Sequence, residues 1–139
     1  MGGFVGTLAI TFMMYVVSPM IMGKPMDVAA MLGDFLGIGR TLGMVVHFMN
    51  GTIIFPLVLT FVLWNMLPGG PTAKGTVWGL ILWFLSQALV MPMMGGGFFS
   101  SNAGGMMAAA GSLIGHIVYG ALLGVITGKP SEVRLARAA

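Results

Sequence analysis

The chain is a succession of long apolar runs separated by short segments rich in glycine and proline. Four runs contain no Asp, Glu, Lys or Arg, and they cover residues 3–22, 41–67, 75–94 and 106–127. A helix of about 20 apolar residues crosses the hydrocarbon core of a bilayer. The regular alternation of apolar and polar residues that a transmembrane β-strand requires is missing. The pattern therefore predicts four membrane-spanning α-helices.

Composition supports the same prediction. Apolar residues make up 58% of the 139-residue chain and charged residues only 6%. A soluble domain has roughly 25% charged residues, so this chain lacks the solvated groups that a water-facing surface needs. We predict a single all-α integral membrane domain over residues 1–139, a four-helix bundle with a short basic tail from 128 to 139. Soluble enzymes and nucleic-acid-binding proteins are excluded.

The basic residues indicate an orientation. An even number of spans places both termini on one side of the membrane. That side holds Lys74, Lys129, Arg134 and Arg137, and the other holds Lys24 and Arg40. Because Lys and Arg collect in cytoplasmic segments, this split predicts cytoplasmic termini. On the opposite side, residues 26–36 repeat apolar side chains at helical spacing, which predicts a short amphipathic helix at the membrane surface.

The two halves of the sequence resemble each other. Matched positions occur in the same order in both: Gly6, Pro19, His47 and Gly51 in the first half, and Gly79, Pro92, His116 and Gly120 in the second. A two-span unit returns the chain to its starting side, so its duplication gives parallel repeats about an axis along the membrane normal. We predict two repeated helical hairpins, with the two histidines at similar depth.

Each histidine lies inside an apolar span, with glycines at intervals of four residues on the same helical face. Such a face permits close helix packing, and it can also admit a flat cofactor. One interpretation is a neutral imidazole that bonds to a carbonyl, Asn50 or Tyr119. The other is a b-type haem held by a facing pair of histidines. The candidate cofactor-binding residues are His47, His116, Gly51 and Gly120.

Methionine and cysteine counts bear on metal chemistry. There are fifteen methionines and no cysteine, so thiolate and disulfide chemistry are excluded. Thioethers favour Cu(I), but methionine also fills irregular apolar packing. The sequence defines no metal-ligand cluster and no nucleophile, carboxylate pair or phosphate loop. We therefore expect a non-enzymatic protein with no catalytic residues and no dedicated metal site.

Three stretches carry a resemblance to known proteins. Residues 78–83, 91–99 and 111–120 resemble a family of small bacterial four-span membrane proteins of unknown function. The resemblance lies mainly within residues 75–124 and extends weakly to 47–56. It implies a location in the bacterial inner membrane and no particular activity.

A bundle of this size without a soluble domain offers packing surface to lipid and to other subunits. We expect a small non-catalytic accessory subunit of a larger membrane complex, such as a respiratory or photosynthetic redox assembly. Its partners would be the lipid bilayer and other integral membrane subunits. Two alternatives are a haem b electron-transfer protein that uses His47 and His116, and a membrane protein that handles Cu(I) or a small solute.

The charge distribution generates a first prediction. Reporter fusions placed after Ala139 and within residues 69–72 should both report the cytoplasm, because four of the six basic residues lie on that side. Reporter activity outside the cytoplasm at either position would reverse the orientation.

Overall fold

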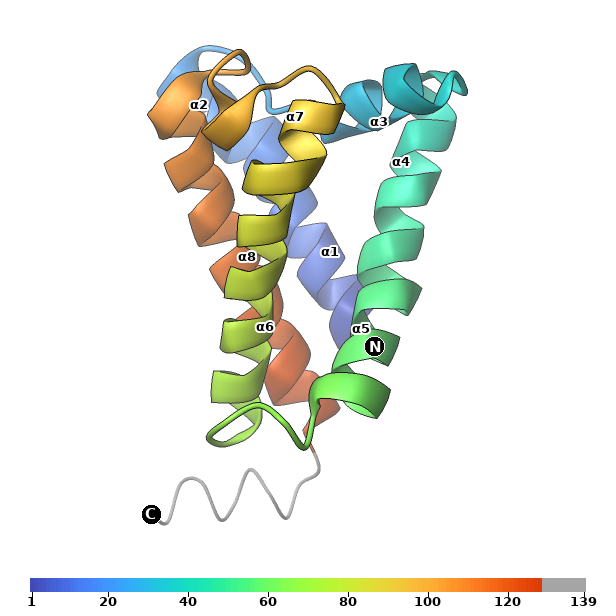
Figure 1. Cartoon of the computed structure of the whole chain (residues 1–139), viewed down its shortest axis with the longest axis vertical. Helices are drawn as coiled ribbons and strands as arrows, with labels where there is room; N and C mark the ends of the chain where they lie inside the picture. The colour runs from blue at the N-terminus through green and yellow to red at the C-terminus, as the bar shows by residue number, and fades with distance from the viewer. Residues whose placement is uncertain (129–139) are drawn as a thin grey trace.

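Four long helical stretches form the structure, a computed structural model that describes residues 1–128 (Figure 1). They are Gly2–Met22, Gly39–Leu63, Pro71–Met93 and Gly105–Thr127, and each is long and apolar enough to cross a membrane. Over the described range there is no β-strand. The predicted all-α four-span fold is confirmed, whereas the superposition of the two hairpins stays a prediction. Residues 129–139, most of the predicted basic tail, lie outside the described range.

The first three spans combine α-helical segments with π-helical turns, and the fourth is one continuous α-helix. The first contains α1 (Gly2–Phe12), η1 (Met13–Val17) and α2 (Ser18–Met22). After α3 (Val28–Leu36), the second contains α4 (Gly39–Met49), η2 (Asn50–Ile54), α5 (Phe55–Leu57) and η3 (Val58–Leu63). The third contains α6 (Pro71–Leu85), η4 (Ser86–Val90) and α7 (Met91–Met93). A single turn, η5 (Phe98–Ser100), precedes α8 (Gly105–Thr127).

Prolines explain three of the π-helical turns. Pro19, Pro56 and Pro92 each lie two residues beyond the end of η1, η2 or η4. Proline has no N–H to donate, and its ring clashes with the carbonyl four residues earlier. Widening the preceding turn by one residue moves that carbonyl aside. Each span therefore continues past its proline.

The second and third spans differ in their bounds from the sequence prediction. The second ends at Leu63 instead of residue 67, and the third begins at Pro71 instead of residue 75. Proline suits the first turn of a helix, where its missing N–H has no partner. The earlier start brings Lys74 into the helix, and its ammonium donates to the carbonyl of Trp64 at 2.6 Å. The lysine charge is thereby accommodated at the end of the span.

Glycines bring the helix backbones into contact around α8, which packs against both α6 and α1. Gly75 and Gly79 of α6 lie against Gly120 and Gly124 of α8, and a Cβ added at any of them would collide with backbone atoms of the other helix. On another side of α8, Gly6 of α1 lies against the Tyr119 ring. Close backbone approach of this kind supplies much of the packing energy between helices in lipid.

The helix predicted between the first two spans is present as α3, at one end of the bundle (Figure 1). Asp27 forms its N-cap, because the carboxylate accepts the N–H of Ala30 at 3.0 Å. The same carboxylate accepts the hydroxyl of Tyr15 and pairs with Nε of Arg40 at 2.7 Å. Since Tyr15 belongs to the first span and Arg40 to the second, Asp27 ties α3 to both.

The charge on Asp27 makes the stability of these contacts between α3 and the first two spans depend on pH. Burial acts to raise the pKa of its carboxyl, but the hydrogen bonds from Tyr15, the Ala30 N–H and Arg40 together hold that pKa below its ordinary value of 3.8. The pKa of the Asp27 carboxyl is lower in the folded than in the unfolded chain. Its ionised form therefore stabilises the fold at pH values above the ordinary pKa. This stabilisation is lost as the pH falls through the folded-state value.

We expect Asp27→Asn to lower the stability of the purified protein at neutral pH by on the order of 1 kcal/mol, because asparagine keeps the cap but loses the charge. The variant should also lose less stability than the wild type on acidification below about pH 4. Thermal unfolding in detergent at a series of pH values measures both effects. Asp34→Asn, on the exposed side of the same helix, is the control. Identical acid profiles for Asp27→Asn and the wild type would contradict this account.

Candidate functional site

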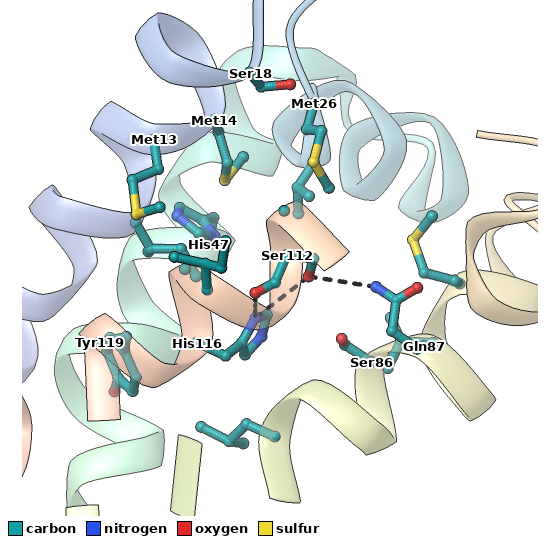
Figure 2. Close-up of a pocket in the computed structure, with 18 of the residues that line it drawn as sticks. Met13, Met14, Ser18, Met26, His47, Ser86, Gln87, Ser112, His116 and Tyr119 are labelled. Atoms are coloured by element: carbon teal, nitrogen blue, oxygen red, sulfur yellow. Dashed lines mark hydrogen bonds between the residues drawn. The ribbon is translucent and has the colours of Figure 1, made fainter. Parts of the chain in front are cut away.

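A cavity of about 420 Å³ lies among the four spans and extends from the α3 end of the bundle to Gly51 and Tyr119. Within the described part of the chain, its lining holds no Asp, Glu, Lys or Arg. The polar lining residues are Thr7, Ser18, His47, Asn50, Ser86, Gln87, Ser112, His116 and Tyr119. Figure 2 shows how several of these side chains converge from different helices. The site is therefore a neutral, largely apolar chamber with a few polar groups.

His116 presents a hydrogen-bond acceptor at this cavity. Its Nδ1 lies 2.8 Å from the carbonyl oxygen of Ser112, one turn earlier in α8. A carbonyl only accepts, so Nδ1 carries the hydrogen and donates it. In a neutral imidazole the other nitrogen then has a free lone pair. Nε2 of His116 is thus the acceptor nitrogen of the ring.

Gln87 and Ser112 join the third span to the fourth beside His116. The amide nitrogen of Gln87 donates to Oγ of Ser112 at 3.3 Å, and its Oε1 accepts the hydroxyl of Ser100 at 2.7 Å. Gln87 is only 2% exposed, and both ends of its amide have partners. The Gln87 amide therefore bonds the third span to the fourth.

His47 adopts the opposite tautomer. Its Nε2 lies 3.0 Å from Oγ1 of Thr11 in the first span. The Thr11 hydroxyl already donates to the carbonyl of Thr7 at 2.6 Å, so His47 Nε2 must be the donor of this pair. The lone pair of His47 therefore belongs to Nδ1. His116 thus bonds to a carbonyl, although this carbonyl belongs to its own helix, and His47 bonds to Thr11. Within residues 1–128 neither ring bonds to Asn50 or Tyr119.

The two candidate glycines have different surroundings. Gly51 lines the cavity and lies against the side chain of Thr7. Gly120 lies away from the cavity, where Gly75 and Gly79 of α6 occupy the space beside it. The structure thus brings His47, His116 and Gly51 together at one chamber and places Gly120 in a helix-packing contact.

Methionines form much of the remaining wall. Seven of the fifteen line the cavity, namely Met13, Met14, Met22, Met26, Met91, Met94 and Met107. Residues 1–128 contain no group of three or more His, Asp or Glu side chains placed to hold a metal ion. A Cu(I) site built from thioethers stays a prediction.

Sequence reasoning missed two contacts that define this site. Thr11 anchors His47, and the Tyr119 hydroxyl donates to the carbonyl of Gly51 at 2.7 Å. The available signal was a hydroxyl inside an otherwise apolar span, which needs a partner because water is absent there. The sequence does not show which partner each hydroxyl takes.

Comparison with known proteins identifies the family. A profile of DUF6789, a family of unknown function, matches residues 1–134, so the chain belongs to that family. The match covers more of the chain than the resemblance seen in residues 75–124. No curated protein and no solved structure matches the chain. The function must therefore be argued from the geometry of the site.

The glycine contacts generate a prediction with a matched control. Gly120→Ala should destabilise the protein by about 1–3 kcal/mol, because the added Cβ would collide with the carbonyl oxygen of Gly75. Gly111→Ala, in the same helix, should be neutral or stabilising by about 0.5–1 kcal/mol, because a Cβ there meets no atom within 4 Å and alanine favours a helix. Thermal unfolding of both variants in one detergent tests the difference. Equal unfolding temperatures would show that the Gly75–Gly120 contact contributes nothing to packing.

Proposed function

We propose that the protein binds a small, neutral and largely apolar molecule within the membrane. The observation that carries this proposal is the 420 Å³ cavity among the four spans, at which His47, His116 and Gln87 converge. Ligand sites are typically chambers of about 300–1,000 Å³ with apolar walls and a few placed polar groups. Polar side chains inside membrane spans are costly, which favours a functional role for such a cluster.

The charge of the lining limits what can bind. Since its residues include no Asp, Glu, Lys or Arg, an ionic molecule would have no countercharge in a region of low dielectric. A neutral molecule needs only apolar contacts and one or two hydrogen bonds. A binding role also requires no reactive group, in keeping with the expectation that the protein is not an enzyme.

The geometry favours an organic ligand over a haem held by both histidines. Haem ligation would use one nitrogen of each ring, and Nε2 of His47 is already engaged with Thr11. His47 would have to break that bond or coordinate through Nδ1. The expected role as an accessory subunit of a redox assembly stays a prediction, because lipid and a partner subunit suit the apolar outer faces equally well.

The membrane location is part of the proposal. We place the protein in a bacterial cytoplasmic membrane with both termini inside, supported by the basic residues and by Lys74 in the first turns of the third span. With this orientation, α3 and the methionine-rich end of the cavity face the outer side.

Gly111→Leu tests the proposal because it adds a bulky side chain to the cavity lining. Gly111 lines the cavity, and a Cβ there meets no atom within 4 Å, so the first atom of the new side chain fits without a collision. The protein is purified from native membranes in mild detergent, extracted with organic solvent and analysed by mass spectrometry. We expect a bound molecule in near-stoichiometric amount in the wild type and at least tenfold less in Gly111→Leu.

Ala110→Leu is the matched control. Ala110 precedes Gly111 in α8 but is exposed on the outside of the bundle, so this variant should retain the molecule. Equal recovery from Gly111→Leu and Ala110→Leu, or no bound molecule in the wild type, would refute binding in this cavity.

A further inference from the structure

Four of the five hydroxyl groups that line the cavity have already used their hydrogens. Four lining residues donate to backbone carbonyls within the protein, namely Thr7 to Gly3, Ser18 to Lys24, Ser86 to Trp83 and Tyr119 to Gly51. A hydroxyl has one hydrogen, so none of these groups can donate to a ligand without breaking a bond. Among the five lining hydroxyls of the described residues, only that of Ser112 lacks such a bond, so this set offers acceptors more readily than donors.

Nε2 of His116 is one of these acceptors, because His116 lines the cavity and its Nδ1 is the donor nitrogen. The bond from Nδ1 to the Ser112 carbonyl fixes both the tautomer and the ring orientation. Gln87 holds the Ser112 hydroxyl from the neighbouring span, and Ser100 holds Gln87 in turn. The Ser112 hydroxyl also lies 3.4 Å from Nδ1 of His116, so this chain of contacts reaches the ring. A ligand that donates to Nε2 therefore meets a ring that is already oriented.

The side chains of the cavity wall indicate which chemical groups of a ligand they suit. The seven methionine side chains at the cavity are flexible and polarisable, and sulfur makes favourable contacts with aromatic rings. Few aromatic side chains of the protein itself line the chamber, chiefly Phe55 and Tyr119. Methionine sulfur atoms are therefore available to surround a ring supplied by the ligand.

We infer that the bound molecule carries a hydroxyl on an aromatic ring, as in a phenol or a hydroquinone, and donates this hydroxyl to Nε2 of His116. This inference rests on the proposed function, since it specifies the chemistry of the molecule that occupies the cavity. The ring lies among the methionines, and the hydroxyl reaches the imidazole.

A matched pair of probes tests this chemistry. β-Naphthol has an aromatic hydroxyl, whereas its methyl ether has the same ring system and no hydrogen to donate. Binding of each to the purified protein in lipid nanodiscs is measured by equilibrium dialysis, with protein-free nanodiscs of the same lipid as the reference. We expect β-naphthol to bind about tenfold more tightly than the ether, which corresponds to about 1.4 kcal/mol.

Variants of the protein test whether the preference for β-naphthol depends on His116. His116→Leu removes the acceptor but keeps an apolar wall, so both probes should then bind with the weaker affinity of the ether. Gly111→Leu should weaken both probes, and Ala110→Leu should weaken neither. If His116→Leu does not fold, nitrogen NMR of histidine-labelled wild-type protein replaces it. The Nε2 signal of His116 should shift with β-naphthol but not with the ether.

The outcomes separate the two proposals. If both probes bind equally and Gly111→Leu excludes both, the cavity is a binding site but the hydrogen-bond inference is wrong. A naphthol preference that survives in His116→Leu, or an unchanged Nε2 signal, also overturns the inference. If neither probe binds the wild type, this inference fails, while the solvent extraction of native protein judges the proposed function separately.

Discussion

Close contact between helix backbones is the constraint on which this structure depends. In lipid, burying an apolar side chain gains little, so helices associate where small residues permit dense packing. Gly75 and Gly79 meet Gly120 and Gly124 along the α6–α8 pair. The carbonyl of His116 itself lies against Gly79, so the same contact sets the height of this histidine in the bundle. The packing of α8 against α6 thus fixes the position of His116 at the cavity.

The second span is held differently, and this leaves room for the cavity. Gly43 of α4 packs against the backbone of Ala29 and Gly33 in α3, and Gly51 packs against Thr7 of α1. In the half of the bundle nearer α3, α4 stands apart from α7 of the third span (Figure 1). The second span is therefore held by α3 at one end and by α1 near its middle, while its other end packs through Leu59 against Trp78 and Tyr119. Between these attachments, side chains line a chamber instead of closing it.

The sequence was sufficient for the features that depend on periodicity and composition. Four apolar runs predicted the spans, and the repeat of apolar residues around Asp27 and Asp34 predicted α3. The π-helical turns escaped prediction because a proline in a span signals a disturbed helix but not how the helix absorbs it. The sequence also grouped Gly120 with the cofactor residues, since spacing shows which residues share a face but not what that face meets. The bonds of His47 to Thr11 and of Gln87 to Ser112 join residues distant in sequence, and only the packing of whole helices determines them.

The walls of the cavity reach the outer surface of the bundle. Ile21, Leu89, Met107 and Ile114 line the chamber and are also among the exposed apolar residues. In a bilayer these side chains meet acyl chains, so the chamber communicates with the hydrocarbon phase. The concentration that governs occupancy is then the mole fraction of the ligand dissolved in lipid, which its water-to-membrane partition coefficient sets. A compound almost insoluble in water can thus saturate the protein although its aqueous concentration is negligible, and occupancy will follow the lipid-to-protein ratio of the sample.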